Sequence, residues 1–229
     1  MSVSAVWFKR DLRLRDHQPL AAAIDAGRPV LLFYCFESML LGDPRYSDRH
    51  WRFVGESLRD MNRELDDRGV RVHVFTGDIL ELFQRLHREL SIAAIYSHEE
   101  TGVALTFERD KRVARFASSE GITWYEYPSN GIQRGRRDRR GWNRAWRDIM
   151  GARQVTPALS HLRPVALNPQ GTAAAMLLRK RAAPWAEADP RFQGGGSTKA
   201  NDCMDSFFAE RGRAYQGSLS SPAASREHC

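Results

Sequence analysis

The chain has 229 residues, a mass of 26.1 kDa and a formal net charge of +7. Hydrophobic residues make up 42% of it, which is enough for a buried core and excludes wholesale disorder. No apolar run approaches the roughly 18 residues of a membrane helix, and the N-terminus turns basic after its apolar residues, opposite to a secretory signal. These features predict a cytoplasmic protein, which we expect to be monomeric and not to contact membranes.

The sequence lacks most standard chemical signatures. Cys35, Cys203 and Cys229 lie far apart, which predicts reduced thiols, and the seven histidines show no metal-ligand spacing, so no metal site is predicted. There is no glycine-rich dinucleotide or phosphate loop and no GxSxG motif. The arginine-rich basic excess has two explanations: a polyanionic partner, with nucleic acid first, or a solvated basic surface.

The predicted strands are five short, almost continuously apolar runs within the first 127 residues. Apolar character without alternation is typical of strands buried on both faces of a parallel sheet. The runs are Val3–Phe8, Val30–Phe36, Val70–Phe75, Ile92–Tyr96 and Ile122–Tyr127.

Four amphipathic helices are predicted between these strands. Asp16 is placed to cap the first, which carries Leu20 and Ile24, and Asp78 is placed to cap the third, over 79–90. The second runs from Trp51 to Leu65 with apolar spacings of three and four, and the fourth spans 107–116. Five strands alternating with four helices predict a doubly wound, Rossmann-like α/β domain.

Ligands of such folds bind beyond the carboxyl ends of the strands. The loops expected at that edge span residues 9–16, 37–46 and 97–105. Within the first loop we favour a structural clasp for Arg13 and Asp16, whereas Asp11 is expected to point at the ligand edge.

An arginine cluster follows the predicted sheet. Seven arginines lie between positions 134 and 147, interleaved with Trp142 and Trp146. They could contact DNA through Arg136, Arg137 and Arg140, or they could form the basic face of a helix whose tryptophans dock into the core. We favour the second interpretation, under which charge reversal of these three arginines leaves DNA affinity almost unchanged.

The remainder predicts a connector and an incomplete second domain. A Pro- and Ala-rich stretch over 156–190, with one helix around 173–182, leads to glycines 194–196. Met204, Phe207 and Phe208 then share a helix face that this short segment cannot bury. We therefore divide the chain into an α/β domain at 1–130, a connector at 131–193 and the start of a helical domain at 194–229, and expect proteolytic trimming near 194–196.

Several motifs resemble the DNA photolyase/cryptochrome family. The opening strand and loop, VWFKRDLRLRD at 6–16, is the most specific of them. The resemblance continues almost to the end of the chain, at 46–58, 97–110, 130–146 and 207–222. It implies that residues 1–130 bind an antenna chromophore and that residues 194–229 begin a helical domain which binds FAD and damaged DNA.

The function implied by the resemblance is that of the N-terminal part of a deoxyribodipyrimidine photolyase. This enzyme is a carbon–carbon lyase that uses blue light and FAD to split cyclobutane pyrimidine dimers. The alternatives are a cryptochrome photoreceptor and a free-standing α/β module that binds a small ligand without photochemistry. Because the chain stops before the family's Ser/Thr-rich flavin-phosphate segment, we expect it alone neither to hold FAD tightly nor to repair DNA, and no catalytic residue is predicted in it.

The resemblance also implies binding residues. Asp11, Phe36 and Glu100 fall where deazaflavin-type members contact their pigment, and Tyr215 is the one flavin contact with a counterpart here. Folate-binding members carry a histidine and a glutamate at the positions of Pro44 and Thr106, which weakens the folate option. For Glu100 a solvated loop acid is an equal alternative, and for Phe36 a core position is favoured.

Overall fold

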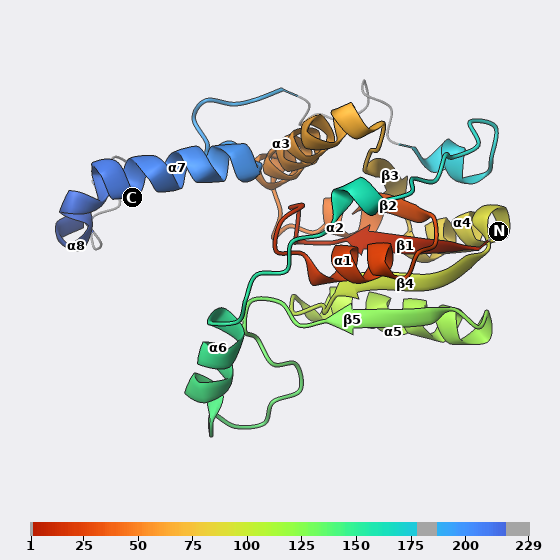
Figure 1. The fold of residues 1–229 in the computed structure, drawn as a ribbon, viewed down its shortest axis with the longest axis horizontal. Helices are drawn as coiled ribbons and strands as arrows, with labels where there is room; N and C mark the ends of the chain where they lie inside the picture. The colour runs from red at the N-terminus through yellow and green to blue at the C-terminus, as the bar shows by residue number, and fades with distance from the viewer. Residues whose placement is uncertain (1, 178–186, 219–229) are drawn as a thin grey trace.

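The computed structural model describes residues 2–177 and 187–218 and contains one five-stranded parallel sheet (Figure 1). Its strand order is β3-β2-β1-β4-β5, so the chain starts in the centre and winds outward in both directions. The strands are β1 (Val3–Phe8), β2 (Val30–Glu37), β3 (His73–Gly77), β4 (Ile92–His98) and β5 (Thr123–Tyr127). The predicted fold class and all five strands are confirmed.

The third strand begins three residues later than predicted. Val72 is buried, but its backbone N–H and C=O bond the side-chain amide of Asn62 at 2.7 and 3.2 Å. Pairing with β2 starts only at His73, opposite Phe33. Val70, Val72 and Phe75 of the apolar run are in the core, but Val72 is held by a helix side chain and not by a neighbouring strand.

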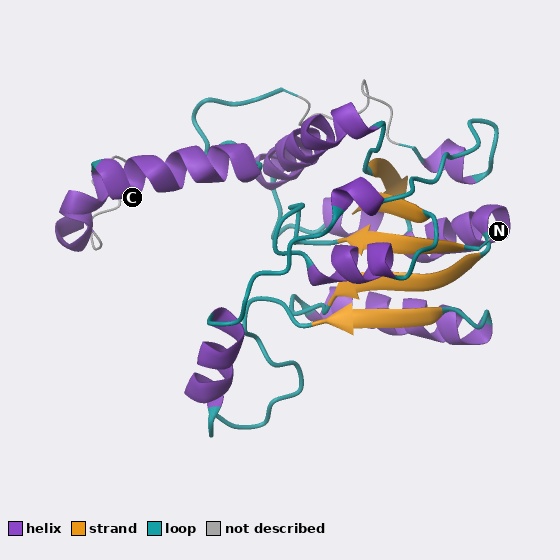
Figure 2. Ribbon diagram, in the orientation of Figure 1, coloured by secondary structure: helices purple, strands orange, loops and turns teal. Residues whose placement is uncertain are grey.

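Helices cover both faces of the sheet (Figure 2). The α1 helix (Gln18–Asp25) and α3 helix (Asp48–Leu65) bury Leu20, Leu58 and Leu65 against one face. The α4 helix (Ile79–Leu90) and α5 helix (Ala104–Ser119) bury Leu82 and Val113 against the other. Two shorter elements, α2 (Ser38–Leu41) and η1 (Asp66–Arg68), flank α3.

The cap of α1 differs from the sequence prediction. His17, not Asp16, occupies the N-cap, and its Nδ1 accepts a hydrogen bond from the Leu20 amide at 3.1 Å. Asp16 has a positive φ of 47° and its carboxylate accepts from the Val155 amide. The clasp predicted for Arg13 is present, because its guanidinium donates to the Asp16 carbonyl at 2.9 Å.

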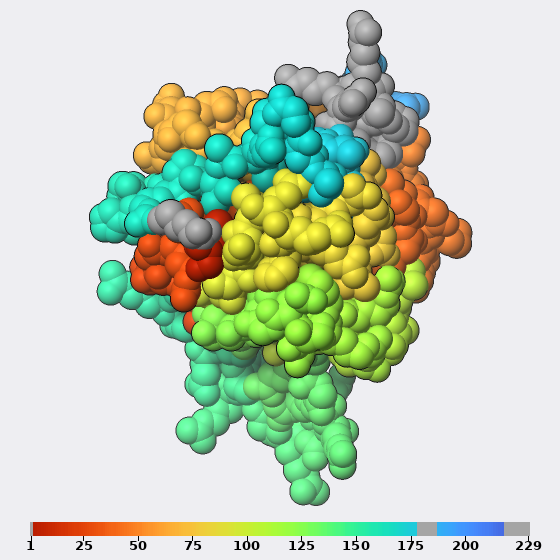
Figure 3. All heavy atoms as spheres, turned by 90° about the vertical axis from the view of Figure 1, so that its right-hand side faces the viewer, coloured from red at the N-terminus to blue at the C-terminus, as the bar shows by residue number. Residues whose placement is uncertain are grey.

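The arginine cluster forms an arm that projects from the body (Figure 3). It contains α6 (Trp142–Met150), in which no residue is buried. Trp142 and Trp146 stack on each other, 6.3 Å apart, and remain 42% and 40% exposed. The favoured interpretation, in which both tryptophans dock into the core, is therefore wrong; Trp146 packs instead over Gly131, where a Cβ would lie 2.9 Å from the indole.

The connector packs onto the α/β domain. Its turns are η2 (Leu159–His161) and η3 (Ala173–Met176), and isolated bridges join Val30 to Pro164 and Phe75 to Leu177. The helix predicted at 173–182 is a 3₁₀ turn up to Met176, and its later positions lie outside the described residues. Ala173 and Met176 are buried in the core, so this part of the connector contributes to the stability of the domain.

The last described segment contains α7 (Ser197–Ala209), η4 (Arg211–Ala214) and α8 (Tyr215–Ser218). It starts beside α3 and extends away from the sheet (Figure 1). Phe208 is 78% exposed and Met204 51%, as the unpaired helix face predicted. Across residues 2–177 and 187–218, no helix combines the length and apolar character that a membrane span requires.

Candidate functional site

A pocket of about 700 Å³ lies at the carboxyl ends of β1 and β2. Doubly wound folds bind their ligands beyond the carboxyl ends of the strands, near the point where the strand order reverses. The α3 helix and residues 192–200 form the other walls of the pocket. The lining includes seven aromatic side chains: Trp7, Phe8, Tyr34, Tyr46, Trp51, Phe53 and Phe192. Its volume suits a ligand of cofactor-fragment or drug size.

A buried ionic network forms the polar side of the pocket. Arg109, only 3% exposed, donates to Glu37 and, at 2.7 Å, to Glu100. It also contacts Asp110 at 2.8 Å, and Asp110 in turn binds Lys9 at 2.9 Å. The loop after β1, the end of β2, the β4–α5 loop and α5 thus meet at one point, and each buried charge has a partner, as burial requires.

Two of the three carboxyl groups of this network have pKa values shifted in opposite directions. For Glu37, burial outweighs the Arg109 charge and hydrogen bond and raises the pKa to about 7. For Glu100, burial also opposes ionisation, but Arg109, Lys9, Arg10 and the Gly102 amide together lower its pKa. Glu37 is therefore a residue of the pocket whose charge changes near neutral pH.

Trp7 forms the floor beneath the network. The Lys9 ammonium lies 4.6 Å from its ring centroid and the Arg109 guanidinium 4.8 Å. Lys9 also lies 5.3 Å from the ring of Trp124. These cation–π contacts fix the position of both cations, so the polar wall is preorganised before any ligand binds.

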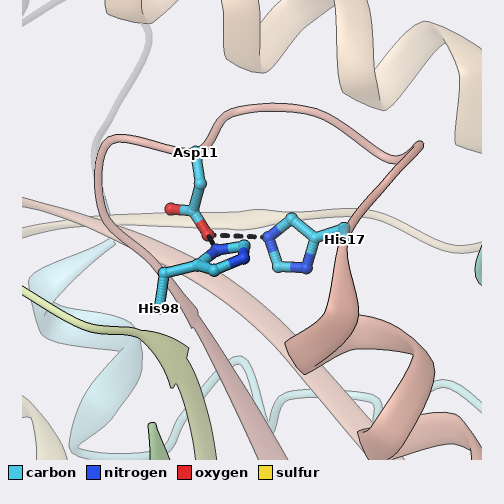
Figure 4. A group of neighbouring side chains, drawn as sticks. All are labelled: Asp11, His17 and His98. Carbon is cyan, nitrogen blue, oxygen red and sulfur yellow. Dashed lines mark hydrogen bonds and ion pairs between the residues drawn. The ribbon is translucent and has the colours of Figure 1, made fainter. Parts of the chain in front are cut away.

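Asp11 belongs to a second buried cluster, beside the pocket and not in its lining (Figure 4). Its Oδ2 accepts from His17 Nε2 at 2.7 Å and from His98 Nδ1 at 2.5 Å, while its Oδ1 accepts from the Lys9 amide. Burial opposes ionisation of Asp11, but the hydrogen bonds from both histidines hold its pKa well below the usual value. Both carboxylate oxygens are thus committed to the protein.

The two histidines and Asp11 have the residue types and spacing of a metal site, but the tautomer of His17 does not fit one. The Leu20 amide can only donate, so His17 Nδ1 must accept and Nε2 must carry the proton of the neutral ring. Burial lowers the pKa of His17, which keeps the ring neutral. A protonated Nε2 cannot bind a metal ion, so the cluster acts as a brace for the loop that follows β1.

The resemblance assigns Asp11, Phe36 and Glu100 to one pigment site, but in the structure they lie in three different surroundings. Glu100 lines the pocket, 4% exposed and ion-paired, so the solvated-acid alternative is wrong. Phe36 is 1% exposed in the core and packs against Trp51, which does line the pocket. Asp11 lies in the adjacent cluster.

Of the other positions named from the sequence, one lines the pocket and the rest lie elsewhere. Thr106 lines the pocket, whereas Pro44 is exposed and does not. Tyr215 packs against Phe207 on the α7–α8 segment, is 41% exposed, and does not line the pocket. Arg136, Arg137 and Arg140 are exposed on the arm.

Sequence reasoning missed Glu37, Arg109 and the pairing of Asp11 with two histidines. Glu37 could have been found from the sequence, because it directly follows an apolar strand run at the predicted ligand edge. Arg109 belongs to one of the motifs that carry the family resemblance, but the sequence indicated no functional role for it. His98 is 87 residues from Asp11, and only the adjacency of β1 and β4 brings them together.

Comparison with known proteins identifies the class of this domain. A doubly wound sheet with a pocket at its switch point defines an α/β ligand-binding domain, and the DNA photolyase family model matches residues 4–133. This match covers more than half of the chain. The chain therefore belongs to the DNA photolyase family, which confirms the resemblance.

Individual relatives are similar over the same region. A cryptochrome DASH of Gloeobacter violaceus is 35% identical over 115 residues, and cryptochrome-1 of Gallus gallus is 32% identical over 126. The aligned parts are 48% and 53% of this chain but only 23% and 20% of those proteins. The chain thus spans about a quarter or less of the length of these relatives.

Solved structures share the fold. A bacterial class III photolyase from Agrobacterium tumefaciens superposes with a TM-score of 0.71 at 21% identity, covering 100% of this chain and 51% of that one. A Synechocystis cryptochrome gives a TM-score of 0.68 at 19% identity, covering 95% of this chain and 49% of that one. Proteins called photolyases and proteins called cryptochromes are thus both among the structural relatives.

Proposed function

We propose that this chain is the N-terminal part of a DNA photolyase and that its pocket binds an antenna chromophore. The observation that carries this proposal is the pocket itself: an aromatic-walled cavity at the switch point, with a preorganised polar side, in a member of the photolyase family. A bound chromophore would absorb light and pass the excitation energy to FAD. The chain's own residues would bind it, orient it and exclude water.

The residues present fit a planar heteroaromatic molecule. Trp51 and Tyr46 stack on each other, 5.0 Å apart, and offer a rigid aromatic wall. Glu37 offers a polar contact. Its carboxyl group can accept a hydrogen bond from a ring N–H when ionised, or donate a hydrogen bond when neutral. Glu100 uses its oxygens on Gly102, Arg10 and Arg109, so its role in this proposal is to position Arg109. The pigment proposed is a deazaflavin or a folate, with the folate option weakened by Pro44 and Thr106.

We propose that the other activities of the family need the further length that the relatives have. We propose residues 1–130 as the chromophore domain, 131–193 as the connector and 194–229 as the start of the helical domain that would bind FAD through Tyr215. A related structure, that of an archaeal photolyase from Sulfolobus tokodaii, contains two FAD molecules. Repair of cyclobutane pyrimidine dimers in damaged DNA and cryptochrome signalling both require that further domain, and both are compatible with the pocket.

A second proposal concerns the arm. Since Trp142 and Trp146 are exposed and not docked, the nucleic-acid interpretation of the cluster gains support. Arg137 and Arg140 donate no side-chain hydrogen bond and form no ion pair to any described residue, and Arg136 bonds only the Asp138 carbonyl and Gln133. Arginines with uncommitted guanidinium groups beside exposed indole rings are suited to DNA phosphates and bases.

The chromophore proposal can be tested by filling the pocket. Ala200, exposed on α7, lines it, whereas its neighbour Asn201 does not. We expect Ala200→Trp to weaken binding of a deazaflavin or a reduced folate at least tenfold, about 1.4 kcal/mol, in a fluorescence titration. Asn201→Trp is the matched control and should bind as the unmodified chain does. Equal binding by both variants, or no binding of either pigment, contradicts the proposal.

A further inference from the structure

A groove of about 800 Å³ lies between α4 and α5, on the face of the sheet opposite α3. Its lining residues follow the three- and four-residue spacing of a helix, from Leu80 to Arg88 along α4 and from Arg112 to Glu120 along α5 and its C-cap. Residues at this spacing share one side of a helix. Each wall of the groove is therefore about two helical turns, or roughly 12 Å, long.

The two helices run in the same direction along the groove. At one end, Arg112 of α5 contacts Asp78, the N-cap of α4, at 3.4 Å. Toward the other end, the His87 ring packs edge-on against Phe116, and its Nε2 lies 3.7 Å from Glu120. An open groove between parallel helices leaves a small molecule largely exposed, but it matches a polypeptide segment of similar length.

Positive charge on both walls has no partner within the chain. Arg88 on α4 and Arg115 on α5 are exposed, and neither guanidinium group forms a hydrogen bond or ion pair with any residue of 2–177 and 187–218. Arg112, the third arginine of the lining, contacts Asp78, and Glu120 is the one acid of the described lining. The two free guanidinium groups can therefore bind carboxylates of another molecule.

The neighbouring acids of both helices do not neutralise these arginines, because they have other partners. Glu81 of α4 is held by Arg85 at 2.5 Å, and Glu108 of α5 is held by Lys111 at 2.8 Å. Glu89 of α4 accepts hydrogen bonds from the connector. The groove is therefore a positively charged surface.

The groove also offers apolar surface and an imidazole with unused hydrogen-bonding capacity. Leu80 and Phe116 are half-buried in its lining. Neither ring nitrogen of His87 forms a hydrogen bond with a described residue, since Nδ1 is buried without a partner and Nε2 lies 3.7 Å from Glu120. Apolar side chains flanked by free cations are suited to one side of an amphipathic helix.

We propose that the groove between α4 and α5 docks an acidic amphipathic helix of a partner protein, with its carboxylates on Arg88 and Arg115 and an apolar side chain against Leu80 and Phe116. A polypeptide is favoured over a nucleic acid because a row of phosphates would meet the carboxylate of Glu120, whereas a helix can place a neutral side chain there. The groove shares no lining residue with the proposed chromophore pocket, so this inference goes beyond that function and does not depend on it.

The test uses two fluorescein-labelled peptides of about fifteen residues, a length at which an isolated helix can form. The first has leucine along one helix side and glutamate along the other, and the second carries glutamine in place of every glutamate. We expect the acidic peptide to bind the 229-residue chain about tenfold more tightly in fluorescence anisotropy at low ionic strength.

Variants assign this binding to the groove. Arg88→Gln combined with Arg115→Gln should weaken the acidic peptide about five- to tenfold and leave the glutamine peptide unchanged. Arg59→Gln combined with Arg68→Gln removes the same charge from exposed positions of α3 and η1 and should bind as the unmodified chain does. Glu120→Gln removes the one acid of the described lining and should tighten the acidic peptide about twofold.

Three results would overturn the docking site. Equal affinity for the two peptides would mean that carboxylates are not recognised. Equal loss in the two double variants would mean that net charge, and not the groove, binds the acidic peptide. If a duplex oligonucleotide displaces the peptide, and its own affinity falls in the Arg88 and Arg115 double variant but not in the control, the groove is a nucleic-acid site instead.

Discussion

The charge state of Glu37 depends on its burial in the pocket. It is 5% exposed, and burial raises its pKa from 4.5 to about 7 even though Arg109 bonds it. Its folded pKa lies above its unfolded pKa, so between pH 4.5 and 7 the unfolded chain gives up a proton that the folded chain keeps. The stability contributed by this group is therefore present below pH 4.5 and is lost as the pH rises to 7.

Replacement of Glu37 by glutamine should remove that pH dependence. Glutamine keeps the size and an acceptor for Arg109 but is never ionised. We expect the free energy of unfolding of Glu37→Gln, relative to the unmodified chain, to increase by about 3 kcal/mol between pH 4.5 and pH 8. Urea unfolding at a series of pH values measures it, with Glu64→Gln on the exposed side of α3 as the matched substitution. A constant difference across this range would show that burial does not raise the pKa of Glu37.

The element that closes the pocket is the glycine segment at the start of α7. The Gly195 amide donates to Glu56 at 2.7 Å and the Thr198 amide to Asp60 at 3.0 Å, so two acids of α3 hold the segment. A Cβ on Gly195 would overlap the Phe53 carbonyl oxygen, whereas one on Gly194 would make an ordinary contact at 3.5 Å. Gly195 is thus required for close approach of two backbones.

Gly195→Ala should release this segment from α3. Overpacking of this kind costs about 1–3 kcal/mol. We expect cleavage between residues 187 and 197 in limited proteolysis, followed by intact mass, to become about tenfold faster than in the unmodified chain. Gly194→Ala is the control and should be cleaved at the original rate. Identical cleavage of the two variants would mean that the contact with α3 does not hold the segment.

Elements were predictable from the sequence where one local pattern determines them. Apolar runs predicted all five strands, and the three–four spacing predicted α3. The pattern reflects burial in the central strands β1, β2 and β4, whereas β5, at the edge of the sheet, has no buried residue. The prediction was wrong where two local rules compete, as at α1, where His17 and Asp16 can both cap and tertiary contacts with Asp11 and Val155 select His17. The Asp11–His98 contact and the Glu37–Arg109 pair join distant strands and helices, so no local pattern contains them.

At the scale of the whole molecule, the positive charge is concentrated in a projecting arm and not spread evenly. Between positions 131 and 150 the acids are Asp138 and Asp148 alone, against seven arginines. Arg134 is tied to Glu126 at 2.8 Å, which anchors the base of the arm to β5. The other arginines are exposed, so the arm presents a positive surface away from the sheet.

If the arm contacts DNA, its arginines must contribute to the salt dependence of binding. Each phosphate contact adds about 0.9 to the slope of log affinity against log salt concentration on duplex DNA. We expect Arg136→Gln, Arg137→Gln and Arg140→Gln, combined in one variant, to lower this slope by about 2–3 in fluorescence-anisotropy titrations of a duplex oligonucleotide. The matched control combines Arg88→Gln, Arg112→Gln and Arg115→Gln, which remove the same charge from the groove between α4 and α5. Equal slopes for the two triple variants would leave the net charge of the protein, and not the arm, as the source of its affinity for DNA.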